Sequence, residues 1–343
     1  LLKKYRHSSG KVKIIGAQIS KWNLKTEHMD INNKKDRLPR EIVAAGVDLR
    51  GIWPVDTIDE RISDILNRMK NTYVFEPDLI CLPETFQTSW VREESRTEDI
   101  AEDETIPGPV TSIIAEEARK QKCYIVCPLV TKNNGNYYNS AVLLNRKGEI
   151  DGVYHKAHLV PSEIENGKLK PGTLTPPVFE TDFGRLGMQI CYDANWFDCW
   201  DHLKREGAEI ICFPSQAPFI NVLKYHAWIN QAYIVSSTGE GAMVIDITGD
   251  ELAVSGQFER WVCTTINLEK VLIHVWPYIR KVKDIREKYR DKINIEIYHP
   301  ENWITIESRH PDVKVHDILK EYEIYTFDGH LKKNEEVQNE YRL

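Results

Sequence analysis

The sequence lacks the features of membrane proteins and of nucleic-acid-binding proteins. None of its apolar runs approaches the roughly 18–20 residues of a membrane span. It has no basic block, and its formal net charge of −7 comes from charges of both signs spread along 343 residues. The basic residues near the start (Lys3, Lys4, Arg6 and His7) precede no apolar segment of the signal type. We therefore expect no membrane partner and no nucleic-acid partner.

The cysteines do not form a disulfide framework. Their number is seven, which is odd, and their spacing follows no framework pattern. We therefore predict a reducing, cytoplasmic environment. Cys123 and Cys127 lie four positions apart in a strand-like segment, so both are expected on one face of a sheet as buried apolar thiols. No cluster of His and Cys completes a zinc pattern, and we expect neither a metal nor another cofactor.

The most informative segment is 187–193, which reads as a buried strand followed by a sharp turn into a helix. Cys191 stands at the turn, and a helix ended by Gly207 is expected over 194–206. Backbone N–H groups at a helix N-terminus favour a thiolate and an oxyanion. A lone cysteine in this setting is also typical of an ordinary buried residue, so the pattern needs support from other segments.

Two further segments place charged residues at strand ends. Glu84 follows a short apolar strand that begins at Asp78, and Lys156 follows a strand over 149–153. A carboxylate, an ammonium group and a thiol are the parts of cysteine-based acyl transfer, in which they act as base, oxyanion donor and nucleophile. The alternative is that Glu84 and Lys156 are solvated loop charges.

Here the sequence resembles the nitrilase superfamily, the carbon–nitrogen hydrolases. The three motifs that carry the resemblance are, in order, Leu82-Pro83-Glu84, His155-Lys156-x-His158-Leu159 and Gly187-x-x-Ile190-Cys191-Tyr192-Asp193. Segments 138–142 and 213–215 also match family blocks, and 13–19 resembles the first strand of that fold. The resemblance covers roughly residues 11–268 and implies an α/β (α+β layered) fold, the four-layer αββα sandwich.

The resemblance also implies a role for each residue of the site. Cys191 is the nucleophile, Glu84 the general base and acid, and Lys156 an oxyanion donor together with the backbone N–H of Tyr192. A second glutamate, seven positions before the glycine of Pro171-Gly172, is Glu165, with Glu163 as the alternative; it would hold Lys156 in position. Asp193 is expected as the N-cap of the following helix. His155 and His158 are expected to satisfy backbone groups rather than act as bases.

The residues around Cys191 favour an amide substrate. Tyr192-Asp193 is the amidase-type continuation of the family motif, so we expect a small-molecule amide, with N-carbamoyl compounds or nitriles as alternatives. The arginine that carbamoyl-amino-acid enzymes carry shortly after the cysteine is absent from 194–197. A substrate pocket is predicted from Phe86, Trp90, Asn195, Trp196 and Phe219, each of which could equally be ordinary core. A catalytically silent binding homologue is the alternative of another class.

The chain is predicted to have two parts. Residues 1–268 form the hydrolase domain, with an amphipathic helix from Thr57 to Val74 and a polar insertion over 21–56. Residues 269–343 form an extension in which 280–292 holds ten charged residues. We expect this extension to have too little apolar content to fold alone and to pack on the domain or on a partner subunit. The resemblance implies a homodimer or higher homo-oligomer.

Overall fold

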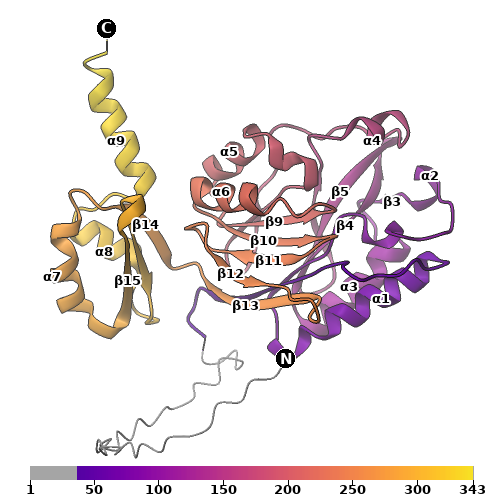
Figure 1. Cartoon of the computed structure of the whole chain (residues 1–343), viewed down its shortest axis with the longest axis horizontal. Helices are drawn as coiled ribbons and strands as arrows, with labels where there is room; N and C mark the ends of the chain where they lie inside the picture. Colours follow the sequence, from indigo (N-terminus) through magenta and orange to yellow (C-terminus); the bar gives the residue numbers. More distant parts are fainter. Residues whose placement is uncertain (1–36, 343) are drawn as a thin grey trace, which may run out of the picture.

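The computed structural model describes residues 37–342, which form a four-layer sandwich and a smaller C-terminal unit (Figure 1). The first sheet has the order β13-β1-β2-β4-β5-β6, with β3 paired to β4. Its strands are β1 (Glu41–Val47), β2 (Leu79–Cys81), β3 (Glu102–Asp103), β4 (Tyr124–Asn133), β5 (Asn136–Leu144), β6 (Ile150–His155) and β13 (Trp261–Asn267).

The second sheet has the order β12-β11-β10-β9-β8-β7. Its strands are β7 (Phe179–Glu180), β8 (Arg185–Met188), β9 (Ile210–Ser215), β10 (Tyr233–Thr238), β11 (Ala242–Ile245) and β12 (Glu251–Val254). Helices α1 (Ile58–Lys70) and α3 (Pro109–Gln121) cover the outer face of the first sheet, and α5 (Asp198–Arg205) and α6 (Ile220–Asn230) cover the second (Figure 1). The predicted αββα sandwich is confirmed.

Alternation along the strands explains how two sheets are buried on both faces. In β4, Tyr124 and Val126 belong to the core between the sheets, whereas Ile125 and Cys127 belong to the core under α1 and α3. Successive side chains of a strand point to opposite faces, so an apolar run without polar residues fits this position. Cys123 joins Cys127 in the same outer core, as the spacing predicted.

Helix α1 follows the expected pattern. Thr57 caps it by accepting a hydrogen bond from Glu60 N–H at 3.3 Å, and its buried positions include Ile62, Ile65 and Met69. This 3–4 spacing places the three side chains on the helix face that packs on the first sheet.

The interpretation of residues 21–56 as a polar insertion is wrong for its last part, because β1 lies there. β1 pairs antiparallel with β13 and parallel with β2, so it stands inside the first sheet. The sequence reason is a six-residue apolar run, 42–47, that alternates between the two cores: Ile42 and Ala44 face the inner core, and Ala45 and Val47 face the outer one. The strand expected over 13–19 lies outside the described residues.

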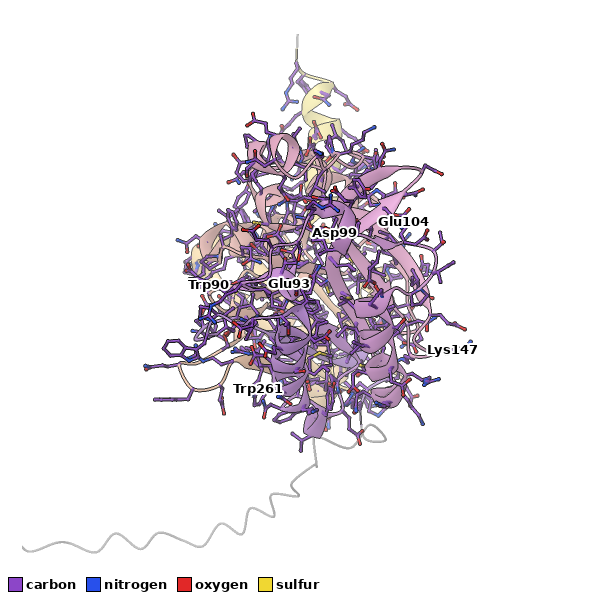
Figure 2. All side chains as sticks on the ribbon, turned by 90° about the vertical axis from the view of Figure 1, so that its right-hand side faces the viewer. Trp90, Glu93, Asp99, Glu104, Lys147 and Trp261 are labelled. Carbon is purple, nitrogen blue, oxygen red and sulfur yellow. The ribbon has the colours of Figure 1, made fainter. Side chains whose placement is uncertain are left out.

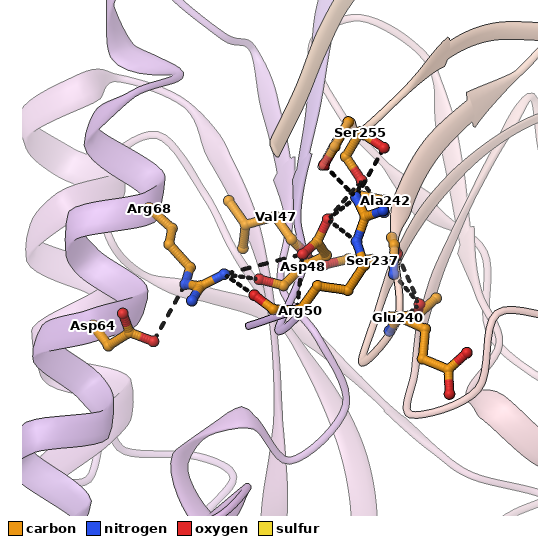
Figure 3. Close-up of polar contacts among 12 residues, drawn as sticks. Val47, Asp48, Arg50, Asp64, Arg68, Ser237, Glu240, Ala242 and Ser255 are labelled. Atoms are coloured by element: carbon orange, nitrogen blue, oxygen red, sulfur yellow. Dashed lines mark hydrogen bonds and ion pairs between the residues drawn. The ribbon is translucent and has the colours of Figure 1, made fainter. Parts of the chain in front are cut away.

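A buried polar cluster at the end of β1 fastens the two sheets together (Figure 3). The Asp48 carboxylate is fully buried and accepts hydrogen bonds from Ser255 Oγ at 2.5 Å and Arg50 Nη2 at 2.7 Å. Arg68 of α1 donates to the Asp48 carbonyl at 2.8 Å. Burying a carboxylate costs free energy unless it is paired, so Asp48 stays buried only where these donors from both sheets surround it.

The C-terminal unit has a core of its own. It consists of the sheet β14-β16-β15 with α7 and α8, and it lies beside the sandwich (Figure 1). Its elements are β14 (Lys270–His274), α7 (Ile279–Tyr289), β15 (Ile293–Tyr298), β16 (Trp303–Ser308), α8 (Val315–Glu321) and α9 (Phe327–Asn339). Ile285, Ile304 and Ile318 are fully buried in this unit.

The expectation that residues 269–343 cannot form a core is therefore wrong. The charged stretch 280–292 contains two core positions of α7, Val282 and Ile285, which lie three apart on one helix face. The unit also packs on the sandwich, as expected: its contacts include the ring pair Trp228–Trp303, whose centroids are 5.3 Å apart, and the ion pair Lys204–Asp328 at 2.9 Å. Packing on a partner subunit stays a prediction.

Two shorter elements also position the site. α2 (Thr97–Ile100) and α4 (Pro161–Glu165) lie near the ends of β3 and β6. Within residues 37–342, no helix combines the length and apolar character that crossing a bilayer requires.

Candidate active site

Four strand ends of the sandwich bring the predicted site residues together. Glu84 follows β2, Lys156 follows β6 directly, Cys191 follows β8, and Gln216 follows β9. The carboxyl ends of parallel strands meet at one edge of a sheet, and in a two-sheet sandwich the two edges face each other. The fold therefore assembles one group from segments that are 25 to 72 positions apart in the sequence.

Lys156 and Glu84 form a buried ion pair. Lys156 Nζ donates to Glu84 Oε1 at 2.9 Å, and the two residues are only 2% and 4% exposed. Asn139 Nδ2 donates to the same Oε1 at 2.8 Å, and the Gln216 N–H donates to Oε2 at 3.0 Å. Burial lowers the pKa of Lys156, but the charges of Glu84 and Glu163 outweigh it and raise the pKa above its usual value. The ammonium group is therefore charged at neutral pH.

The second carboxylate at Lys156 is Glu163, so the prediction of Glu165 is wrong. Glu163 Oε2 accepts from Lys156 Nζ at 2.9 Å, and its Oε1 accepts from Asn139 Nδ2 at 2.6 Å. The Glu165 side chain is exposed at the end of α4.

Helix geometry explains this correction. Glu163 occupies the third position of α4, and its carboxylate turns back to accept the Val160 N–H at 2.8 Å. Residue 165 lies two positions further, which is about 200° around a helix of 3.6 residues per turn. The side chain of Glu165 therefore points away from Lys156.

Cys191 stands on a strained elbow. Its φ is +46°, a left-handed backbone conformation that non-glycine residues rarely adopt. The residue begins a 3₁₀ turn (Cys191–Asn195) whose first internal hydrogen bond runs from Asp193 N–H to the Ile190 carbonyl at 3.0 Å. The Tyr192 N–H directly precedes this first donor, and the backbone N–H that hydrogen-bonds to the Cys191 thiol is that of Gln216.

The environment of the Cys191 thiol raises its pKa. Burial is the largest cause and the negative charge of Glu84 the second; Lys156 and hydrogen bonding from Ser215 and Gln216 act in the opposite direction. The resting group is therefore a neutral thiol, which requires a base before it can act as a nucleophile. The adjacent Glu84 carboxylate is such a base.

Asp193 was expected to cap the following helix, but it supports the elbow instead. α5 begins only at Asp198. Asp193 is fully buried, and its Oδ2 accepts from the Ile190 N–H at 2.9 Å and from the Tyr154 hydroxyl at 2.7 Å. Its Oδ1 accepts from the His158 N–H at 2.8 Å. These contacts hold the turn that presents Cys191.

The ring nitrogens of the two histidines contact carboxylates, so the expectation that these residues satisfy backbone groups is wrong. His155 Nε2 lies 2.7 Å from Glu104 Oε2, and the ring stacks on Tyr138. His158 Nδ1 lies 3.1 Å from Asp193 Oδ1, and this hydrogen bond is the main reason that the pKa of His158 is raised.

The predicted pocket residues divide into two groups. Asn195 and Trp196 lie at the elbow: Asn195 Nδ2 donates to the Tyr192 carbonyl at 3.1 Å, and Trp196 stacks on His158 at 4.3 Å. Phe219 is the N-cap residue that precedes α6, and it packs edge-on against Phe213 of β9, with centroids 6.0 Å apart.

Phe86 is core rather than pocket wall, because the turn after Glu84 directs it under α1 and α3, where it is fully buried. Trp90 is 67% exposed and lies on the outer surface near Glu93 (Figure 2).

Sequence reasoning assigned no role to Asn139 or Gln216, although both contact Glu84. Each lies within or directly after a segment that resembles a family block, 138–142 and 213–215. The usable signal was a polar amide in or beside an otherwise apolar strand.

Comparison with known proteins shows the family of this chain. A carbon-nitrogen hydrolase family model matches residues 58–272, which is more than half of the chain. The nitrilase of Pyrococcus abyssi is 32% identical over 167 residues, which cover 48% of this chain and 62% of that protein. The deaminated glutathione amidase of Synechocystis is 28% identical over 163 residues, 40% of this chain and 60% of the relative. The chain thus spans about three fifths of the length of these two relatives, and 35% of a Drosophila melanogaster nitrilase and fragile histidine triad fusion protein.

Solved structures share the fold. Nit3 of Saccharomyces cerevisiae superimposes with a TM-score of 0.56 at 21% identity, over 74% of this chain and 96% of that chain. An amidase from Nesterenkonia sp. gives a TM-score of 0.57 at 18% identity, over 67% and 92%. By the family match, the motif order and the shared sandwich, this chain belongs to the carbon–nitrogen hydrolases of the nitrilase superfamily.

Proposed function

We propose that this protein hydrolyses the carbon–nitrogen bond of a small amide through a thioester on Cys191. The observation that carries the proposal is the buried Glu84–Lys156–Glu163 ion-pair network beside a thiol on a strained elbow. Such a network costs stability when it is buried, so its presence at a nucleophile favours a catalytic role over a silent scaffold.

Glu84 is the general base in this proposal. A carboxylate has about four lone-pair positions, and the structure occupies two at Oε1 and one at Oε2. The remaining position of Oε2 can accept the Cys191 proton. The thiolate then attacks the carbonyl carbon, and the carbonyl electrons move onto oxygen.

Lys156 is the electrostatic donor to that oxygen. An ammonium group has three N–H donors, and Glu84 and Glu163 take two of them. The third can face the oxyanion together with the Tyr192 N–H, and the positive charge stabilises the developing negative charge. Glu163 and Asn139 are positioning residues, because they fix Lys156 and Glu84.

Collapse of the tetrahedral intermediate expels the amine, which leaves with the proton held by Glu84. Glu84, again a carboxylate, takes a proton from water, and the resulting hydroxide attacks the thioester. The acid is released, and the proton returns to the Cys191 sulfur. Each half-reaction uses the same base, in line with its single position beside the thiol.

The test is ammonia or amine release across aliphatic, aromatic and N-carbamoyl amides and nitriles, with mass spectrometry of the Cys191 peptide. We expect an acyl adduct on Cys191 with an amide. Cys191→Ala should lower turnover by a factor on the order of 10⁴ while the protein stays folded. A folded Cys191→Ala variant with near-normal turnover, or an adduct on another residue, would overturn the assignment.

The same panel separates the alternatives. Preference for N-carbamoyl compounds or nitriles would change the substrate class and leave the roles intact. Absence of turnover and of any adduct across the panel would favour a binding homologue.

A further inference from the structure

A second group of reactive side chains lies beside the elbow, outside the Glu84–Lys156–Cys191 network. Within residues 37–342, His158, Asp198 and Cys199 bring a ring nitrogen, a carboxylate oxygen and a thiol sulfur within 4.8 Å of one another. His158 Nε2 is 3.5 Å from Asp198 Oδ2. Four-coordinate zinc holds such ligand atoms roughly 3.3–3.6 Å apart. The nitrogen and oxygen therefore already have ligand spacing, and the sulfur lies within 4.8 Å of both.

The hydrogen bonding of His158 leaves one ring nitrogen toward Asp198. Nδ1 lies 3.1 Å from Asp193 Oδ1, so Asp193 is placed to accept the Nδ1–H, and Nε2 faces the Asp198 carboxylate at 3.5 Å. A cation between Nε2 and the carboxylate would bind both atoms.

The surroundings of the ring resemble those of metal-bound histidines. Such histidines commonly donate their other N–H to a carboxylate, which fixes the tautomer and orients the ring; the fully buried Asp193 is placed to do this. Cys199 adds a sulfur to the group. Imidazole, thiolate and carboxylate together suit a borderline-soft divalent ion.

We propose that His158, Asp198 and Cys199 bind a divalent transition-metal cation of the Zn²⁺ class, with a fourth position open to water. The ion enters from the side of Asp198, whose side chain is 44% exposed, whereas Cys199 is buried. Cys199 gives up its thiol proton to solvent as the metal–sulfur bond forms. The N-terminal dipole of α5 opposes the cation, and the negative charges of Asp193 and Asp198 offset that opposition.

The bound ion would join the first turn of α5 to the loop after β6. It would also act on the elbow, because Asp193 holds both His158 and the Ile190 N–H. The site is thus a structural or regulatory one, coupled to the presentation of Cys191 without a part in the chemistry.

The experiment uses Co²⁺ and Zn²⁺ with the full chain carrying Cys191→Ala, which removes the other thiol at the elbow. Co²⁺ bound by one thiolate in a four-coordinate site shows a sulfur-to-cobalt charge-transfer band and strong visible bands. We expect one ion per chain, about one proton released, and a rise in the unfolding temperature with Zn²⁺. Cys199→Ala should remove the charge-transfer band, and Asp198→Asn should weaken binding by at least about tenfold.

Cys263→Ala is the matched control, because Cys263 is a half-buried cysteine outside the group and should leave the spectrum unchanged. Unfolding curves without metal establish that each variant is folded. If Cys199→Ala does not fold, Asp198→Asn still tests the site, because residue 198 is partly exposed. Absence of the charge-transfer band in the parent, or equal Co²⁺ affinity in a folded Asp198→Asn variant, would overturn the proposal in favour of an imidazolium between Asp193 and Asp198.

Discussion

Two glutamates of the same short helix provide a matched test of how Lys156 is held. Glu163 contacts Lys156 Nζ at 2.9 Å and Asn139 Nδ2 at 2.6 Å, whereas Glu165 is exposed. Glu163→Gln and Glu165→Gln remove the same charge from α4 within two positions of each other. A general effect of charge on the helix or on solubility should therefore be equal in the two variants.

The expected loss can be estimated from the contacts. A hydrogen bond to a charged group contributes about 1.5–3 kcal/mol, and Glu163→Gln replaces the carboxylate partner of the Lys156 ammonium with a neutral amide. Each 1.36 kcal/mol is tenfold in rate, so kcat/KM should fall roughly 10- to 150-fold if the loss is expressed in the transition state. The Gln amide also presents an NH₂ group, which cannot accept from Lys156 or Asn139.

The assay is steady-state hydrolysis of the best amide of the panel, with pre-steady-state release of the amine. Glu163→Gln should lower kcat more than it changes KM, because Lys156 acts on the oxyanion rather than on the bound amide. Glu165→Gln should remain within about twofold of the parent protein. If the two variants lose activity equally, or if only Glu165→Gln loses it, the assignment of Glu163 as the positioning residue is wrong.

Three further perturbations test the other members of the site and the C-terminal unit. Lys156→Arg should lose roughly 10²–10³ in kcat, the cost of a missing oxyanion donor, because a planar guanidinium cannot replace a compact ammonium group between two carboxylates; retention of more than half the rate would place Lys156 outside the chemistry. Burial and the Glu84 charge raise the pKa of Cys191, so its modification by a small neutral thiol reagent, followed by mass spectrometry, should accelerate only above the range of a free cysteine. Glu84→Gln removes one cause of that rise and should move the profile to lower pH, whereas an unchanged or higher profile would contradict the charge coupling. Residues 269–342 have their own core, so truncation after residue 268 should leave a folded sandwich; light scattering on both forms tests whether the predicted homo-oligomer depends on the extension.

The family resemblance implied the four layers, and local patterns predicted that Glu84, Lys156 and Cys191 stand at strand ends. Cys191 follows an apolar strand and precedes a turn, and Glu84 and Lys156 also stand where apolar strands end. Strand ends are readable because polar residues begin where burial stops. The fold then brings the ends together, which the family resemblance implied and which spacing along the chain cannot establish.

The errors arose where composition and tertiary position disagree. β1 is short and flanked by charged residues, so it resembled part of a polar loop although both its faces are buried. The core of the C-terminal unit was concealed in the same way, since α7 places its two buried residues among charged ones.

Glu163 shows a different limit, because the sequence spacing did not give the direction in which each side chain of α4 points. Counting from a Pro-Gly step fixes a distance along the chain, but α4 is only five residues long and begins immediately after Val160. At the third helical position a carboxylate can turn back to the N-cap amide, and the same turn brings it to Lys156. Two residues further along, an equally charged side chain faces solvent. The start of the helix, rather than the spacing to the next turn, therefore selects which glutamate enters the site, and the Glu163 and Glu165 variants measure the consequence of that selection directly.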